Sequence, residues 1–369
     1  NINKRFYCTN NLKNTILNSD ITFVCVPTPY SKKIFNLKFI KAASIDIAKV
    51  LNIKNSKHLI VYKSTILPTT CEQIILPLLK KKLKKSIFNK INLAFNPEFL
   101  REGDAVNDFM HPDRLVIGSK NKETCDLLKK VYKPFNFEHV ITTNIKTAEM
   151  IKYASNAFFA NLISFSNEIA NLSFNIKGID SFEVINGLKL DKRFYNKVNN
   201  KNYFPSLISY IEPGPGFGGS CFPKDVKSLI EFGKKNGRKM ELLSSVLKVN
   251  ESQHKEIVRI LKTKFKNLKN INISILGLSF KADTDDIRES PSLKLIKKSG
   301  KLFKSIKVFD PIVKLDKEFI NNKNIFNVQN LEEATKNVKV IIIMNKWKIF
   351  NKLKILIKKN NNTYIFDTR

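Results

Sequence analysis

The chain has 369 residues and a formal net charge of +33, because 65 lysine and arginine residues outnumber 32 acidic ones. This length predicts two or three domains with a substantial core, and no apolar stretch reaches the roughly 18 residues of a membrane-spanning helix. The excess charge is mostly lysine spread along the chain, without an arginine stripe or an aromatic-basic RNA motif. We therefore expect neither a membrane nor a nucleic acid as a partner, although the basic charge suits anionic substrates.

Apolar and amphipathic segments alternate in the first part of the chain. Strands are expected over residues 21–26, 58–62, 91–95 and 115–117, and helices over 37–51 and 70–82. This βαβ order predicts a parallel sheet covered by helices. Thr28, Thr65 and Glu98 follow three of the strands, at the edge of the sheet where ligands bind in this class of fold.

A long amphipathic helix is expected over residues 147–174, with Met150, Phe158 and Phe165 on its apolar side. A second βα series follows, with strands expected at 271–277, 308–311, 338–344 and 364–367. The expected fold class is therefore α/β, with two Rossmann-like parallel-sheet domains joined by a long central helix.

The five cysteines show neither C-x-x-C spacing nor nearby pairs of histidines. This pattern predicts no disulfide framework and no metal site, and it favours a reducing, cytoplasmic setting. Cys25 lies in the apolar run 21–26 and is expected in the core. Cys221 differs, because it lies in the glycine-rich segment 214–225 among small and polar neighbours.

The glycines of this segment match the G-x-G-x-x-G pattern of dinucleotide-binding loops. Such a loop follows a strand and binds pyrophosphate through N–H groups, which Pro213 and Pro215 lack. We interpret the glycines instead as shaping a loop around Cys221. Pro223 favours a helix start, and the helix dipole and Lys224 both favour a nucleophilic thiolate. A buried structural cysteine is the alternative.

Two pairs of polar residues have a spacing of four. Glu98 and Glu102 would present both carboxylates on one face if their segment is helical. A carboxylate beside a thiolate is a candidate base for activating water, although acidic residues are also common at solvated helix starts. Lys152 and Asn156 lie on the long helix and are candidates for stabilising an oxyanion. The alternative for this lysine is an ordinary surface position.

Further charged residues lie near the second strand series and the cysteine loop. Lys281 and Arg288 follow the first strand of that series, with three aspartates between them, and are candidates for phosphate contacts. Asp225 is placed to hydrogen-bond a water or Lys152, although it also suits the first turn of a helix.

Several segments, in order along essentially the whole chain, together resemble the UDP-glucose/GDP-mannose dehydrogenase family of NAD-dependent nucleotide-sugar dehydrogenases. The segments are 26–29, 63–65, 96–103, 111–118, 148–157, 216–225, 277–281 and 288–291. The resemblance implies that a sugar C6 alcohol is oxidised to a carboxylate through a thiohemiacetal and a thioester on Cys221, with two NAD molecules as hydride acceptors. It also implies that Glu98 is the base for hydrolysis, that Lys152 and Asn156 stabilise oxyanions, and that Asp225 works with Lys152 and the catalytic water.

The motifs are most similar to those of family members that convert UDP-glucose to UDP-glucuronate. UDP-N-acetylmannosamine and GDP-mannose are alternative substrates, and an inactive remnant of such an enzyme is a further alternative. The positions that match NAD contacts are Thr28, Thr65, Glu102, Lys224 and Arg288. The positions that match UDP-sugar contacts are Glu98, Phe99, Leu100, Arg101, Glu102, Lys152, Asn156, Tyr210, Ile211, Glu212, Pro213, Gly214, Gly218 and Lys281.

The resemblance predicts three domains and a homodimer or higher homo-oligomer. We expect an NAD-binding domain over 1–143, a central helical and dimerisation domain with the cysteine loop over 144–265, and a UDP-sugar-binding domain over 266–369. The opening strand and glycine loop of the family are not found at the start of the chain, so the first domain is expected to be incomplete and to bind NAD poorly or not at all. The chain also stops at 367–369, where the family usually runs on, and residues 193–212 form a longer link than is usual before the cysteine loop.

Overall fold

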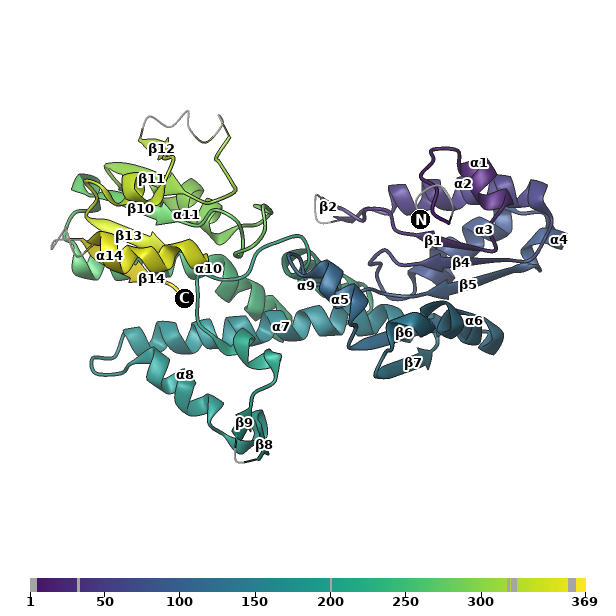
Figure 1. The fold of residues 1–369 in the computed structure, drawn as a ribbon, viewed down its shortest axis with the longest axis horizontal. Coiled ribbons are helices and arrows are strands. Elements are labelled where there is room, and N and C mark those ends of the chain that lie inside the picture. The colour runs from purple at the N-terminus through teal and green to yellow at the C-terminus, as the bar shows by residue number, and fades with distance from the viewer. Residues whose placement is uncertain (1–4, 32–33, 200, 317–318, 320–323, 358–362) are drawn as a thin grey trace. The chain divides into compact units, whose positions relative to one another are not determined.

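The structure is a computed structural model that describes the chain except for residues 1–4, 32–33, 200, 317–318, 320–323 and 358–362. Its internal contacts divide the chain into two compact units, residues 1–155 and 156–369. Each unit contains a five-stranded sheet with helices on its faces (Figure 1). The three predicted domain ranges stay predictions.

The first unit is built on a sheet with the strand order β1-β4-β5-β6-β7. Its strands are β1 (Ile21–Val24), β4 (His58–Tyr62), β5 (Ile91–Phe95), β6 (Arg114–Ser119) and β7 (His139–Thr143). The helices α2 (Lys38–Lys54), α3 (Leu76–Lys82) and α6 (Lys122–Tyr132) lie between strands in the sequence. Leu51, Ile60 and Phe95 are fully buried where helices pack on the sheet. The four expected strands and the expected helix over 37–51 are confirmed, with ends shifted by up to three residues.

One strand pair departs from the expected parallel sheet. β6 runs antiparallel to β5, with Phe95 opposite Gly118, whereas β1, β4 and β5 are mutually parallel and β6 is parallel to β7. The connection from β5 to β6 contains only the short helix α5 (Ala105–Met110). A parallel neighbour requires a crossover that covers one face of the sheet, and this connection does not provide one.

The expectation that Cys25 lies in the core is wrong. Its thiol is exposed, because β1 is an edge strand of the sheet and ends at Val24, one residue earlier. The buried cysteines are Cys71 and Cys125. Cys71 begins a π-helical turn (Cys71–Ile75) that leads into α3, where the sequence predicted one continuous helix.

The long helix α7 (Ile145–Phe174) is confirmed and is continuous across the boundary of the two units (Figure 1). Three of the large apolar residues expected on its apolar side do not face the core: Met150 is 38%, Phe158 52% and Phe165 45% exposed. The packed face contains the fully buried Tyr153 together with small residues such as Ala157 and Ala160. Small side chains let neighbouring elements approach the helix closely.

The second unit contains a parallel sheet with the strand order β12-β11-β10-β13-β14. Its strands are β10 (Asn272–Leu276), β11 (Ser305–Phe309), β12 (Ile325–Asn327), β13 (Val340–Ile343) and β14 (Tyr364–Asp367). In this order the chain moves outward from β10 in both directions, which is the doubly wound Rossmann arrangement. Ligands of such sheets bind at the carboxyl ends of the strands where the order reverses, here β10 and β13.

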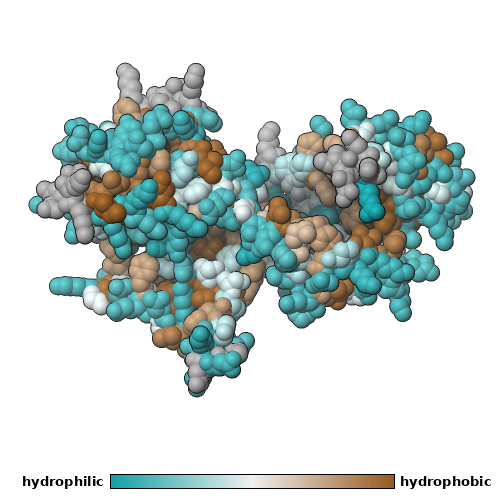
Figure 2. All heavy atoms as spheres, in the orientation of Figure 1, coloured by the Kyte–Doolittle hydropathy of each residue, from teal (hydrophilic) through white to brown (hydrophobic). Residues whose placement is uncertain are grey.

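In the sequence, α7 is followed by α8 (Ser181–Lys189), the hairpin of β8 (Asn196–Val198) and β9 (Lys201–Tyr203), α9 (Phe222–Lys235) and α10 (Glu241–Lys264), and then by this sheet. The hairpin occupies the long link that the sequence placed before the cysteine loop. Hydrophilic side chains cover most of the visible face in Figure 2, as a dispersed lysine excess predicts. Among the residues that the structure describes, no helix has the length and apolar character needed to cross a membrane.

Candidate active site

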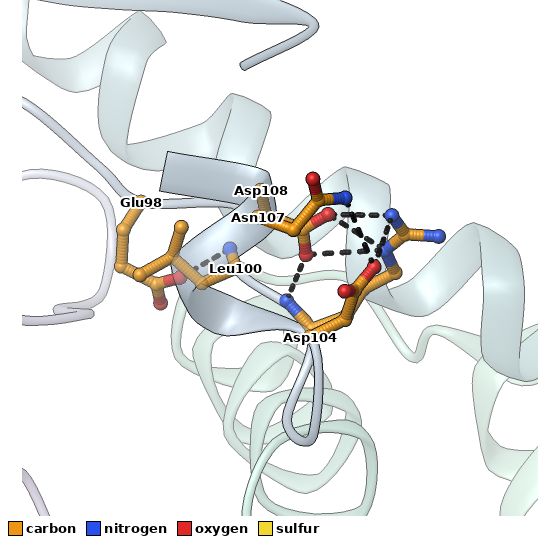
Figure 3. Close-up of polar contacts among 6 residues, drawn as sticks. Glu98, Leu100, Asp104, Asn107 and Asp108 are labelled. Atoms are coloured by element: carbon orange, nitrogen blue, oxygen red, sulfur yellow. Dashed lines mark hydrogen bonds and ion pairs between the residues drawn. The ribbon is translucent and has the colours of Figure 1, made fainter. Parts of the chain in front are cut away.

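In the first unit, a partly buried ion pair joins the segment after β5 to α7. The Lys152 ammonium lies 3.0 Å from Glu98 Oε1 and donates to the Glu98 carbonyl oxygen at 2.6 Å. The Leu100 N–H donates to Glu98 Oε2 at 2.7 Å (Figure 3). Because Lys152 is 4% exposed, this charge is compensated mainly by the carboxylate. Glu98 is therefore held in one orientation with both oxygens engaged.

Glu98 and Glu102 do not lie on a helix, so the condition for a shared helical face is not met. Residues 96–101 have no regular structure, and the helix α5 begins only at Ala105. The bond from the Leu100 N–H to the Glu98 carboxylate turns the chain locally instead, a typical alternative to a helical bond for an acidic side chain.

Arg101 is tied to carboxylates near its own segment. Its Nε lies 3.1 Å from both carboxylate oxygens of Asp108, its Nη2 donates to Asp104 at 3.1 Å, and its backbone N–H donates to Asp108 at 2.6 Å (Figure 3). The neighbouring Phe99 ring has the Arg114 guanidinium 3.9 Å and the Lys152 ammonium 5.3 Å from its centroid. The segment is thus fixed by charge pairs and by cation–π contacts.

The carboxyl ends of β1, β4 and β5 carry further polar groups. Thr28 and Thr65 follow β1 and β4, which are adjacent and parallel, and both are partly exposed. Lys63 donates to Asn96 Oδ1 at 3.1 Å and to the Tyr132 hydroxyl at 3.3 Å. Burial lowers the pKa of the Lys63 ammonium below its ordinary value, against the opposing fields of nearby acidic groups. The polar strand ends fit the edge at which a dinucleotide binds in this fold.

In the second unit, the predicted helix start at Cys221 is confirmed. Cys221 is the N-cap residue of α9, Pro223 lies in the first turn, and the thiol is exposed. Asp225 lies one turn further along and is 1% exposed. The Asn156 amide donates to Asp225 Oδ2 at 2.6 Å, and the Lys224 ammonium lies 3.1 Å from Oδ1. Asp225 was expected to contact water or Lys152, and Asn156 is the partner that the sequence did not predict.

The glycines before Cys221 serve close packing. A Cβ at Gly218 would lie 2.6 Å from the Glu289 carbonyl oxygen, and the Gly219 N–H donates to the Arg288 carbonyl at 2.8 Å. Gly216 has a φ of +105° beside the Asn250 amide, which bonds both backbone groups of Phe217 at 2.7 and 3.0 Å. The element before the loop is a 3₁₀ helix (Ser206–Ile211), so the strand that a dinucleotide loop requires is absent there.

The segment before these glycines contains five predicted substrate residues. The Tyr210 ring packs against the Phe159 ring in a tilted arrangement, with centroids 4.5 Å apart, whereas the Ile211 side chain is buried in a small core. Glu212 lies 3.2 Å from the Lys189 ammonium and 2.6 Å from that of Lys346. Burial tends to raise the pKa of the Glu212 carboxyl, but the two lysines outweigh it, so the pKa lies below its ordinary value. Pro213 is buried, and the N–H of Gly214 donates to the side chain of Asn167 at 2.6 Å.

The loop after β10 carries the two predicted phosphate contacts. The Arg288 guanidinium pairs with both oxygens of Asp286 at 2.8 and 2.9 Å, and Lys281 Nζ lies 5.9 Å from the Phe280 ring centroid. Asp310, whose role was not predicted from the sequence, organises the start of this loop. Its carboxylate accepts the N–H groups of residues 278, 279, 312 and 313 and the Trp347 indole N–H. The aspartate-proline pair directly after a strand was the available sequence signal.

No group of three or more His, Cys, Asp or Glu side chains able to hold a metal ion occurs among the described residues.

Three family models match the chain in order. They are the NAD binding domain of the UDP-glucose/GDP-mannose dehydrogenase family over residues 1–136, its central domain over 146–252 and its UDP binding domain over 274–369. The chain belongs to the UDP-glucose/GDP-mannose dehydrogenase family. It is an NAD-dependent oxidoreductase with NAD as its cofactor, and the resemblance expected from its motifs is confirmed.

Similar members of the UDP-glucose/GDP-mannose dehydrogenase family cover nearly the whole chain. The UDP-glucose 6-dehydrogenase of Rickettsia conorii is 38% identical over 95% of this chain and 76% of its own length. The Bacillus subtilis UDP-glucose 6-dehydrogenase TuaD is 35% identical over 94% of this chain and 71% of its own. The structure of a UDP-glucose dehydrogenase from Pyrobaculum islandicum matches with a TM-score of 0.85 and 30% identity, over 98% of this chain and 79% of that one.

Proposed function

We propose that the protein oxidises the C6 alcohol of UDP-glucose to the carboxylate of UDP-glucuronate through a thioester on Cys221. The observation that carries the proposal is an exposed thiol at the start of α9, one turn before the buried Asp225 and its partner Asn156. A helix start favours the thiolate, which attacks aldehydes readily. The names of the similar proteins support UDP-glucose rather than UDP-N-acetylmannosamine or GDP-mannose as the substrate.

In this proposal the thiolate keeps the aldehyde bound to the protein. When bound, NAD accepts one hydride from the sugar carbon in each of the two oxidations. Between them, Cys221 Sγ forms a bond to the aldehyde carbon, and the aldehyde oxygen takes up a proton to complete the thiohemiacetal. Loss of hydride and of that proton leaves the thioester, and attack by water then breaks the carbon–sulfur bond. The products are the carboxylate and the regenerated thiolate.

The polar side chains have separate roles in the proposal. Glu98 takes a proton from the hydrolytic water, and the bonds from Lys152 and the Leu100 N–H fix its orientation for this task. Lys152 and Asn156 supply the positive charge and the amide that stabilise oxyanions. Asp225 orients the Asn156 amide through their hydrogen bond.

The remaining contacts follow the family positions. Thr28 and Thr65, at the ends of adjacent strands, bind NAD together with Glu102, Lys224 and Arg288. The UDP-sugar contacts the segments 98–102 and 210–214, Gly218 and Lys281. The tight packing of Gly218 against the loop after β10 supports this assignment, because it places the cysteine loop beside the loop that carries Lys281.

We also infer that a second copy of this chain is a partner. Phe158, Phe165 and Leu172 recur every seven residues on α7 and are 45–58% exposed. Residues seven apart lie on one face of a helix, so these side chains form one apolar stripe, which we call the α7 stripe. A second α7 presents the matching stripe to it in a two-fold dimer.

Replacement of the proposed nucleophile tests the reaction. Cys221→Ser is expected to lower UDP-glucuronate formation by at least about 1000-fold, because a neutral hydroxyl does not form the covalent intermediate. Cys8→Ser is the matched control, since Cys8 is also an exposed, free cysteine. NADH absorbance and chromatography of the products give the rate and the product. Undiminished formation of UDP-glucuronate by Cys221→Ser contradicts the proposal, and the same assay with UDP-N-acetylmannosamine and GDP-mannose decides the sugar.

A further inference from the structure

A fully buried carboxylate on α7 has no task in the chemistry proposed above. Glu149 is 0% exposed, and its Oε1 accepts the N–H of Cys71 at 2.9 Å, across 78 residues of sequence. Its other oxygen, Oε2, is buried and has no hydrogen-bond partner. Burying a carboxylate with one unsatisfied oxygen destabilises the fold. Such a group in a protein structure calls for an explanation, for example a functional role.

The segment held by Glu149 connects β4 to the π-helical turn and begins with Thr65. Thr69 has a φ of +74°, a left-handed conformation that is strained for a β-branched residue. The backbone of Thr69 also lies close enough to the Glu149 carboxyl to lower its pKa. Such strain persists only where surrounding contacts impose it, and the carboxylate of Glu149 accepts the N–H of Cys71, two residues further on.

We propose that Glu149 in its ionised form is a positioning residue that holds the segment 65–71, and with it Thr65, in the conformation that binds NAD. This inference rests on the proposed function only for the contact between Thr65 and NAD. The hold itself rests on the bond to Cys71, the burial of Glu149 and the strained backbone of Thr69. An ionised carboxylate accepts stronger hydrogen bonds from N–H groups than a neutral carboxyl does.

The surroundings of Glu149 set the pH at which its carboxylate binds the segment 65–71 less firmly. Burial raises the pKa of the Glu149 carboxyl to about 7, against the hydrogen bond from the Cys71 N–H and the contacts with the Cys71 thiol and the Thr69 backbone, and the charge of Glu72 adds to the rise. The Cys71 thiol has a pKa well above its ordinary value, because it is buried beside Glu149, and is therefore neutral. Glu72 itself is paired with Lys120 and Lys146. Glu149 therefore takes up a proton as the pH falls through about 7.

Two measurable quantities then change in opposite directions with pH. Affinity for NAD falls as the pH drops below about 7, because the protonated carboxyl holds the segment less firmly. The stability of the fold rises over the same range, because the folded-state pKa lies above the ordinary value and the folded protein binds the extra proton. If Glu149 had a purely structural role, affinity for NAD and the stability of the fold would not change in opposite directions with pH.

The test is a titration with NAD by calorimetry at about pH 6 and about pH 8. For the wild type, the dissociation constant is expected to be roughly fivefold higher at the lower pH. Glu149→Gln is expected to bind with the weaker constant at both pH values, while its thermal midpoint at the higher pH stays equal to that of the wild type or exceeds it. Glu72→Gln, which removes the charge that adds to the rise of the Glu149 pKa, is the control and is expected to keep a pH dependence, with its midpoint at a lower pH than in the wild type.

Two further measurements separate the hold from NAD binding. Amide hydrogen exchange of the peptide 66–75 is expected to be faster in Glu149→Gln than in the wild type, without any ligand. Thr69→Gly, which removes the strain, is expected to restore NAD affinity when added to Glu149→Gln. Unchanged exchange and an unchanged dissociation constant in Glu149→Gln overturn the inference. Absence of NAD binding by the wild type overturns instead the assigned role of Thr65, whatever the exchange shows.

Discussion

Carboxylates with different partners define the chemistry of this protein at the scale of single residues. Glu98 is engaged by an ammonium and an N–H group, and Asp225 by an amide and an ammonium. Glu149 has one N–H partner at Oε1 and an unsatisfied second oxygen. Groups of one chemical type thus acquire different properties from burial and neighbours, which is the usual means by which a fold assigns acid–base roles.

Gly218 gives a prediction about stability at this scale. Gly218→Ala is expected to lower the free energy of unfolding by about 1–3 kcal/mol, because its Cβ would lie 2.6 Å from the backbone oxygen of Glu289. Gly187→Ala is the matched control, since nothing lies within 4 Å of the Cβ that it adds in α8. Alanine in that helix is expected to stabilise by up to about 1 kcal/mol. Denaturant unfolding measures both, and equal effects of the two substitutions contradict the close packing at Gly218.

The helix α7 combines several features at the scale of secondary structure. It carries Glu149, Lys152 and Asn156 within about two turns, and the α7 stripe further along. Residues three or four positions apart lie on nearly the same face of a helix, so Glu149, Lys152 and Asn156 share one face. The residues of the α7 stripe lie on a different face. One element thus positions polar groups in both units and presents an apolar surface.

The α7 stripe gives a prediction about assembly. Phe165→Glu is expected to convert a dimer to a monomer, because it introduces two buried charges at a two-fold interface. Val106→Glu, at an 81% exposed position on α5, is the control and is expected to leave the assembly unchanged. Light scattering coupled to gel filtration gives the molar mass. A wild type that is monomeric at micromolar concentration contradicts the inferred interface.

At the scale of the whole molecule, much of the fold could be predicted because hydrophobic periodicity is local. The strands at residues 58–62 and 91–95 and the helix α7 follow directly from apolar runs and spacing. The antiparallel pairing of β6 with β5 could not be predicted in this way, because pairing direction depends on how the connecting segment packs. The exposure of Cys25 likewise depends on the edge position of β1.

The site was predictable where one residue carries the chemistry and its local context shows it. The sequence around Cys221 and Pro223 predicts a helix start, and in the structure both residues lie at the start of α9. Asn250, Asp310 and Glu149 were missed, because each acts through backbone groups of a segment far away in the sequence. Single polar residues on helices, such as Asn250 and Glu149, carry no signal of such distant partners.

The central claim is a covalent thioester on Cys221, and its direct test is the mass of the peptide that contains this cysteine. Glu98→Gln lacks the proposed base for hydrolysis, so the intermediate is expected to accumulate during turnover of UDP-glucose with NAD. Acid quenching, digestion and mass spectrometry are expected to find a UDP-glucuronyl adduct on the Cys221 peptide and none on the Cys8 peptide. Turnover of the wild type with an unmodified Cys221 peptide in the quenched Glu98→Gln variant, together with full activity of Cys221→Ser, contradicts the account.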